Sequence, residues 1–80
     1  MPTILNAGPY RIGWFMYDCQ EPPHVHVVRD DKTVKIWLNS LEMQGETRFR
    51  ANEVRRIVRI IQSNQPFLLQ RWEKVCDEQT

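Results

Sequence analysis

The chain has little glycine, no excess of charge of either sign and no long hydrophobic run, and each absence argues against a class of protein. Its 80 residues include three glycines, and none of the glycine patterns that cradle phosphate groups is present. The 11 basic and 10 acidic residues leave a net charge of +1, so bulk electrostatics indicate neither nucleic acid nor a membrane surface as partner. No run approaches the roughly 18 apolar residues of a membrane span, and we predict no membrane association.

Cysteine is also scarce, with two in the chain, Cys19 and Cys76, and no Cys-x-x-Cys pair. Neither stands in the sequence context of a serine or cysteine hydrolase. The segment from Met1 to Leu5 has neither a basic start nor a long apolar run, so we expect no secretory signal peptide. Because thiols stay reduced in the cytoplasm, the sequence predicts a cytoplasmic protein with two free thiols.

What the chain does have is enough apolar residue for one small packed domain. Hydrophobic residues make up 41% of the sequence, which favours a folded chain over a disordered one. Eighty residues lie near the lower limit at which a hydrophobic core alone supports a fold. We therefore predict a single domain over residues 1–80, with a thin core that a homodimer interface or a partner protein would supplement.

The first half of the chain has the pattern of β-strands. A Gly8-Pro9 turn signal precedes a run of aromatic and β-prone residues from Tyr10 to Tyr17, which predicts a strand. The segment from Asp18 to Pro23 predicts a loop, because its two prolines have no backbone N–H to donate to a β-ladder.

Residues 24–29 and 33–38 predict the two arms of a β-hairpin that turns at Asp30-Asp31, since aspartate tolerates turn geometry. A symmetric register places four apolar side chains on one face: Val25, Val27, Val34 and Ile36. A slip by one residue would break this match. On the other face the register predicts two pairs: His24 with Trp37, and His26 with Lys35.

The second half has helical periodicity after an irregular segment at residues 39–47. Apolar residues recur at helical spacing at Val54, Ile57, Val58 and Ile61. Pro66 ends this helix, because the residue before a proline disfavours helical geometry, and it starts a second one. Strands followed by helices predict an α+β fold, with an antiparallel sheet of about four strands and two C-terminal helices packed on one face.

The two histidines are the most informative residues for function. Residues two apart on a strand point to the same side, so His24 and His26 would lie about 7 Å apart along it. With Lys35 opposite His26, they form a candidate catalytic site, in which the imidazoles exchange protons near neutral pH and the lysine stabilises developing negative charge. Cleavage of an RNA phosphodiester needs these three roles and no cofactor.

Two other interpretations of the histidine pair stay open. The pair could bind a divalent metal ion together with a third ligand from Asp18, Cys19 or Glu21. It could also serve the fold alone, with the imidazoles hydrogen-bonded to carbonyl groups of the proline loop.

Five further residues are candidates for binding. Trp37, on the histidine-bearing face, would stack on a nucleic-acid base unless it belongs to the core. Glu21 is either a ligand or an exposed loop carboxylate. Arg55, Arg56 and Arg59 form a basic cluster that would hold phosphate or an acidic partner, or simply the solvated face of an amphipathic helix.

The sequence resembles a bacterial family, the domain-of-unknown-function family four-one-six-zero, over nearly its whole length. The resemblance is carried by these segments: Met1-Pro2-Thr3-Ile4, Gly8-Pro9-Tyr10-Arg11, Glu21-Pro22-Pro23-His24-Val25-His26-Val27, Lys35-Ile36-Trp37-Leu38 and Leu68-Leu69-Gln70-Arg71-Trp72. The chain departs from the family at Arg50, where relatives have a helix-capping serine, and near Asn39-Ser40, where they have a proline-bearing turn.

The resemblance implies a small cytoplasmic bacterial protein encoded beside another small domain, as in toxin–antitoxin pairs. The leading hypothesis is accordingly a component of a toxin–antitoxin-like module that binds a partner protein, with RNA as a further ligand. The competing hypotheses are a metal-independent endoribonuclease using His24, His26 and Lys35, and a divalent-metal-binding domain. Whether the protein is an enzyme stays open, and no cofactor is predicted.

Overall fold

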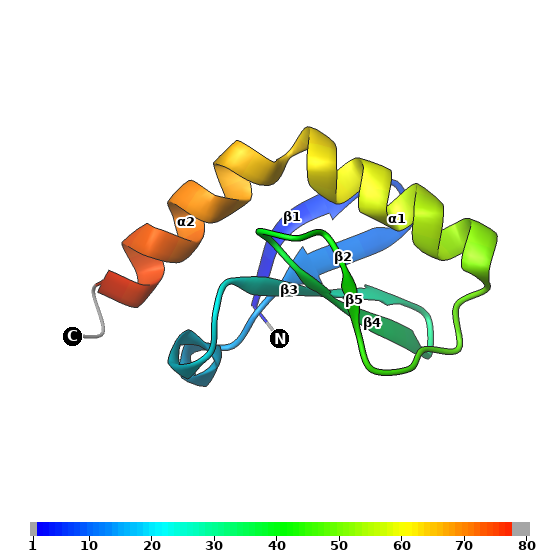
Figure 1. Cartoon of the computed structure of the whole chain (residues 1–80), viewed down its shortest axis with the longest axis horizontal. Helices are drawn as coiled ribbons and strands as arrows, with labels where there is room; N and C mark the ends of the chain where they lie inside the picture. The colour runs from blue at the N-terminus through cyan, green and yellow to red at the C-terminus, as the bar shows by residue number, and fades with distance from the viewer. Residues whose placement is uncertain (1, 78–80) are drawn as a thin grey trace.

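The computed structural model describes residues 2–77, which form an antiparallel sheet followed by two α-helices (Figure 1). The strands are β1 (Thr3–Ala7), β2 (Tyr10–Gly13), β3 (His24–Arg29), β4 (Lys32–Trp37) and β5 (Met43–Gln44). A 3-10 helix, η1 (Met16–Gln20), joins β2 to β3, and the chain continues into α1 (Ala51–Ser63) and α2 (Gln65–Asp77). The strands lie in the order β1-β2-β3-β4-β5, so the α+β prediction is confirmed. The fifth strand is β5, which lies in the segment predicted to be irregular.

The β3–β4 hairpin has the predicted register. Val27 pairs with Val34 and Val25 with Ile36, and on the other face His26 pairs with Lys35 and His24 with Trp37. The hairpin turns at Asp30, whose φ of 55° lies in the left-handed region that aspartate tolerates better than most residues. The apolar match therefore fixed which side of the sheet each histidine faces.

The predicted strand from Tyr10 to Tyr17 is wrong in its second half, because β2 ends at Gly13 and η1 begins at Met16. Trp14 leaves the sheet to pack against Trp72 of α2, with ring centroids 5.1 Å apart. Tertiary packing of this aromatic ring outweighs the local β-propensity of the run. The turn that follows brings η1 over the start of β3.

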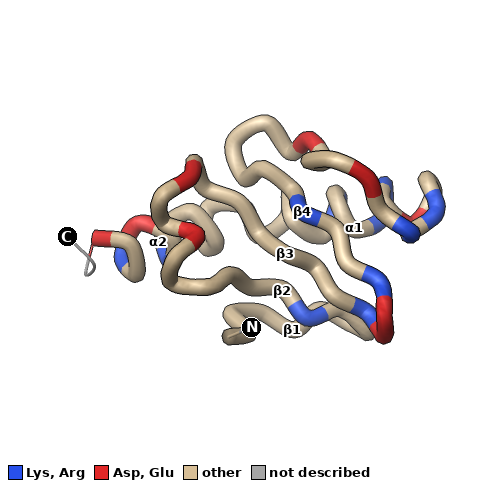
Figure 2. The backbone as a smooth tube through the Cα atoms, turned by 90° about the horizontal axis from the view of Figure 1, so that it is seen from below, with Lys and Arg blue, Asp and Glu red and all other residues tan. Residues whose placement is uncertain are grey.

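The core lies between one face of the sheet and the two α-helices, and the other face is covered by neither α-helix, although η1 lies over the start of β3 (Figures 1 and 2). The predicted helical periodicity is confirmed, since Ile57 and Ile61 of α1 are fully buried against the hairpin's apolar face. The helix begins after Arg50, which makes no side-chain cap hydrogen bond. The next helix, α2, has Leu68 and Trp72 buried. Within residues 2–77, no helix combines the length and apolar character needed to cross a membrane.

Gly13 is the position at which the sheet has no room for a side chain. A Cβ added there would overlap the backbone carbonyl of Pro2, which leads into β1. We predict that Gly13→Ala lowers the free energy of unfolding by about 1–3 kcal/mol, the usual range for overpacking, and exposes the amides of β1 to exchange. Urea denaturation and amide hydrogen exchange would measure both effects.

Gly45→Ala is the control, because nothing lies within 4 Å of a Cβ at that position, although its φ is 73°. That variant should lose stability through backbone strain alone and keep β1 protected. Unchanged stability in Gly13→Ala would contradict the close approach of Pro2.

Candidate functional site

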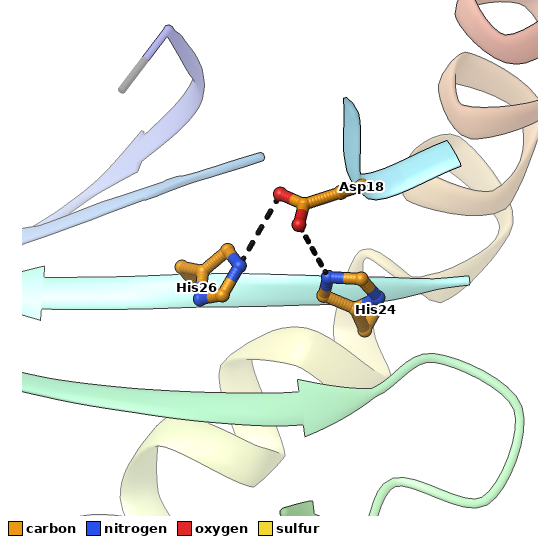
Figure 3. A group of neighbouring side chains, drawn as sticks. All are labelled: Asp18, His24 and His26. Carbon is orange, nitrogen blue, oxygen red and sulfur yellow. Dashed lines mark ion pairs between the residues drawn. The ribbon is translucent and has the colours of Figure 1, made fainter. Parts of the chain in front are cut away.

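Asp18 of η1 meets both histidines of β3 at the end of the sheet (Figure 3). Its Oδ1 lies 3.4 Å from His24 Nε2, and its Oδ2 lies 3.3 Å from His26 Nε2. One nitrogen or oxygen from each residue falls within 4.8 Å of the other two. Asp18 is 5% exposed and His24 is fully buried, while the side chain of His26 is 27% exposed. The cluster is thus closed on the His24 side and reaches solvent at His26.

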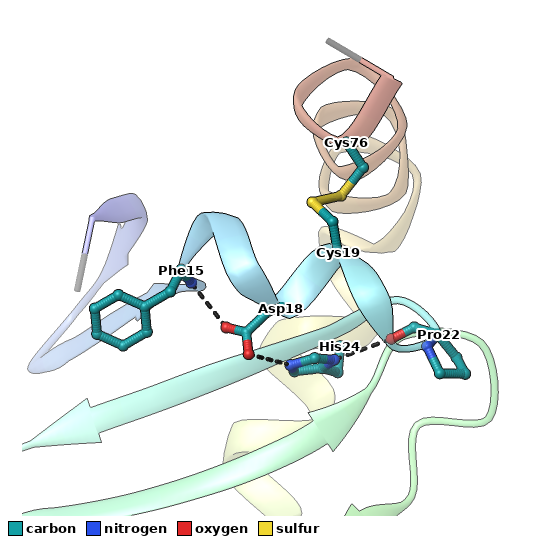
Figure 4. The surroundings of a disulfide bond; sticks show 6 residues. All are labelled: Phe15, Asp18, Cys19, Pro22, His24 and Cys76. Carbon is teal, nitrogen blue, oxygen red and sulfur yellow. Dashed lines mark hydrogen bonds and ion pairs between the residues drawn. A yellow bond between two sulfur atoms is a disulfide. The ribbon is translucent and has the colours of Figure 1, made fainter. Parts of the chain in front are cut away.

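The position of Asp18 depends on the backbone of η1. Its Oδ2 accepts a hydrogen bond of 2.8 Å from the Phe15 backbone N–H, as an N3 carboxylate does with the N-cap residue in a capping box. The next residue, Cys19, forms a disulfide with Cys76 in the last turns of α2 (Figure 4). One local hydrogen bond therefore orients the carboxylate, and the disulfide of the next residue ties the backbone that carries it to a distant helix.

This disulfide corrects the prediction of two free thiols. The Cα atoms of Cys19 and Cys76 lie 5.5 Å apart, within the normal range for a disulfide. The two residues are 57 apart in the sequence, and they meet because η1 and the end of α2 pack side by side. Cysteine spacing and the expected compartment could not predict this pairing, because the pairing depends on tertiary contact alone.

The hydrogen bonds of His24 fix which nitrogen carries its proton. Nδ1 lies 2.9 Å from the carbonyl oxygen of Pro22, and because a carbonyl can only accept, Nδ1 must donate. In the neutral ring Nε2 then has a lone pair instead of a proton. That atom is buried and has no hydrogen-bond partner, although a carboxylate oxygen of Asp18 lies 3.4 Å away. A lone pair and a carboxylate repel each other unless a positive charge lies between them.

Distance distinguishes two ways of supplying that charge. A protonated imidazole donating to a carboxylate normally comes within about 2.7–2.9 Å, and the two contacts of Asp18, at 3.3 and 3.4 Å, are longer. Ligand atoms on a tetrahedral metal ion with bonds of about 2.0–2.1 Å are about 3.3–3.4 Å apart. Both contacts are therefore longer than a tight ion pair. They involve different oxygens of Asp18, and a set of one ligand atom from each residue lies within 4.8 Å, close to the spacing that one ion needs.

The environment of His26 favours its neutral form. Burial lowers the pKa of His26 from its ordinary value. The carboxylate of Asp18 opposes this, while His24 and, to a smaller extent, Lys35 act in the same direction as burial. A neutral imidazole is the form that binds a metal ion or accepts a proton. His26 is therefore able to act as a ligand or base at the solvent-facing side of the cluster.

The predicted residues Lys35, Glu21 and Trp37 lie beside this cluster. Lys35 Nζ is 2.7 Å from Glu21 Oε1 and 4.7 Å from the centre of the Trp37 ring. Its positive charge therefore already interacts with a carboxylate and with an aromatic ring. The same contact with Lys35 holds the pKa of Glu21 below its ordinary value. Trp37 is half-buried, and its Nε1 donates to Gln44.

The basic cluster of Arg55, Arg56 and Arg59 lies elsewhere. All three side chains are exposed on α1, which covers the opposite face of the sheet from Lys35 (Figure 2). The structure therefore does not bring these arginines together with the histidines. From sequence, Asp18 is predicted only as one of three optional metal ligands. Trp72 is not predicted to contact the histidines, although its ring lies 5.1 Å from that of His24.

Comparison with known proteins gives a family but no characterised relative. The model of a family described as a domain of unknown function, DUF4160, matches residues 10–73, which include the whole cluster. No curated protein and no solved structure matches the chain.

The hydrogen bond to Pro22 predicts a specific tautomer of His24. In metal-free protein above neutral pH, long-range ¹H–¹⁵N spectra should show His24 with Nδ1 protonated and Nε2 unprotonated, because only Nδ1 has an acceptor within 3 Å. His26 lies on the same strand and serves as the internal reference for an imidazole without the hydrogen bond to Pro22. A His24 ring protonated at Nε2 would contradict the geometry described above.

Proposed function

The chain belongs to the DUF4160 family, and we propose that it is a divalent-metal-binding domain whose site consists of Asp18, His24 and His26. The observation that carries this proposal is the Nε2 atom of His24, which is buried, unprotonated in the neutral ring and without a hydrogen-bond partner. A metal ion would satisfy this atom and neutralise the carboxylate beside it.

The surroundings of the cluster support a metal ligand role. Histidines that bind metal ions usually donate their other ring N–H to a carbonyl or carboxylate, which fixes the ring, and the His24 hydrogen bond to Pro22 is of this kind. The carboxylate of Asp18 is likewise oriented by the Phe15 N–H. Two imidazoles and one carboxylate suit Zn²⁺ and neighbouring first-row ions.

The openness of the site at His26 bears on what the ion would do. Three protein ligands leave at least one position for water or another ligand, which is typical of catalytic rather than structural zinc sites. Because part of the His26 side chain is exposed, that position would face solvent, beside Lys35. A divalent ion there would make a bound water more acidic and polarise an anionic ligand.

The metal-independent ribonuclease has less support. It needs two imidazoles that reach the substrate, and the ring of His24 is fully buried beneath Trp72 and the proline loop. His26 keeps partial access to solvent, so one of the two proposed reagents is available.

A second candidate is the binding of a partner protein or RNA in a toxin–antitoxin-like module of a bacterial cytoplasm. The specific observation in its favour is the uncovered face of the sheet (Figure 2), which presents Lys35 and Trp37 next to His26. Tyr17, 68% exposed, lies at the η1 end and stacks on Phe15. Aromatic rings beside a basic residue would suit single-stranded RNA.

The metal proposal is tested by titrating the purified protein with Zn²⁺ and with Co²⁺. We expect one ion per chain, a shift of the ring resonances of both histidines, and Co²⁺ absorption typical of low coordination number. His26→Gln should weaken binding at least about tenfold, because it removes a ligand from a partly exposed position where the fold tolerates change.

Glu21→Gln is the matched control, since it removes a carboxylate three residues after Asp18 that lies outside the cluster. The metal affinity of this variant should stay within about twofold of that of the wild type. Absence of binding in the wild type, or equal loss in both variants, would contradict the site. His24→Ala is a poorer test because the ring is part of the buried packing.

The RNA candidate is tested by comparing two basic residues on opposite faces of the protein. Lys35→Gln should weaken the binding of a short single-stranded RNA, measured by quenching of tryptophan fluorescence, whereas Arg59→Gln should leave it unchanged. Equal effects would indicate nonspecific charge attraction and would remove the sheet face as the binding surface.

A further inference from the structure

We infer that the Cys19–Cys76 disulfide controls the metal affinity of the Asp18, His24 and His26 site, so that reduction of the disulfide weakens metal binding. This regulation rests on the proposed function. It concerns the position of one ligand, Asp18, and leaves the two histidines on their strand.

The first argument is the connection between the disulfide and the ligands. Cys19 directly follows Asp18 in η1, and Cys76 follows Trp72 by one helical turn, on the same side of α2. The Trp72 ring lies 5.1 Å from the His24 ring, and Figure 4 shows the disulfide bridging η1 to α2 on the same side of the protein. One face of α2 thus packs on one ligand and is covalently attached to the segment that carries another.

The second argument is that, apart from the contacts of Asp18, the side chains of η1 do little to hold it. Asp18 is the buried residue of this five-residue helix, while Met16 and Tyr17 are 49% and 68% exposed. Short 3-10 helices have poor hydrogen-bond geometry, so packing and cross-links must stabilise them. His24 and His26, in contrast, are held by the β3–β4 ladder. Loss of the disulfide therefore disturbs the position of the Asp18 carboxylate more than the positions of the two imidazoles.

The chemistry is ordinary thiol–disulfide exchange. A dithiol reductant attacks one sulfur, the Cys19–Cys76 bond breaks through a mixed disulfide, and the reductant leaves as its own disulfide. Two electrons and two protons pass to the protein, which gains two thiols. Both cysteines are only partly buried, so the bond is within reach of a reductant, and a disulfide oxidant would restore it.

The expected size of the effect follows from what remains. In the reduced protein the Phe15 hydrogen bond still favours the position of Asp18, but the carboxylate has to be ordered when the ion binds. Losing the support that orients a metal ligand typically reduces affinity 10–100-fold. We expect a weaker site rather than an abolished one.

The experiment compares Zn²⁺ affinity in three proteins. They are the oxidised wild type, the wild type reduced with a dithiol and then freed of it under nitrogen, and the Cys19→Ser/Cys76→Ser variant. We expect the dissociation constant to rise about 10–100-fold in both the reduced protein and the variant, with the helix and strand signals of circular dichroism retained. The variant also shows whether the new thiols themselves bind zinc.

Equal affinity in all three proteins would overturn the regulation and leave the proposed function standing. Tighter binding after reduction in the wild type alone would overturn it as well, because a thiol would then be the ligand. Absence of binding in every form would overturn the proposed function together with its regulation.

A metal-free measurement covers the case in which the variant does not fold. On reduction of the wild type, the amides of η1 should exchange faster while those of β3 and β4 stay protected. Unchanged exchange in η1 would show that the disulfide does not hold Asp18, and the inference would fail.

Discussion

The contacts of the Asp18 carboxylate tie together parts of the chain that otherwise have little reason to meet. It accepts the Phe15 N–H and lies against His24 and His26, so the turn after β2 is fixed over the start of β3. A buried carboxylate is unfavourable unless charges or hydrogen bonds compensate it. The Phe15 N–H compensates it in part, and under the proposed function a bound cation would compensate the rest.

The sheet and helices were predictable from sequence because each depends on a local pattern. Alternating valines fixed the hairpin register, and with it the side of the sheet on which His26 faces Lys35. The end of β2 at Gly13 was not predictable, since Trp14 leaves the sheet for a partner in α2, far along the chain. The short strand β5 was missed for a similar reason, because a two-residue strand has no period to detect.

The candidate site was predictable only in part. The two histidines were found from their spacing on a strand, but their different environments were not, since burial of His24 depends on Trp72 and on the return of η1. The disulfide was not predictable, because the expected cytoplasmic compartment favours free thiols. Its two cysteines become neighbours only when η1 and α2 are both in place, which no local pattern encodes.

The energetics of so small a protein favour a functional explanation of the cluster. A buried polar atom without a partner, such as His24 Nε2, costs roughly 1–3 kcal/mol, a large part of a typical stability of about 5–15 kcal/mol. Closing a loop across 57 residues contributes about 4 kcal/mol in the chain-entropy description. The disulfide therefore offsets the cost of the cluster that it adjoins. Under the proposed function a bound ion would satisfy the same atom directly, so the cross-link and the metal would stabilise the same end of the sheet by different means.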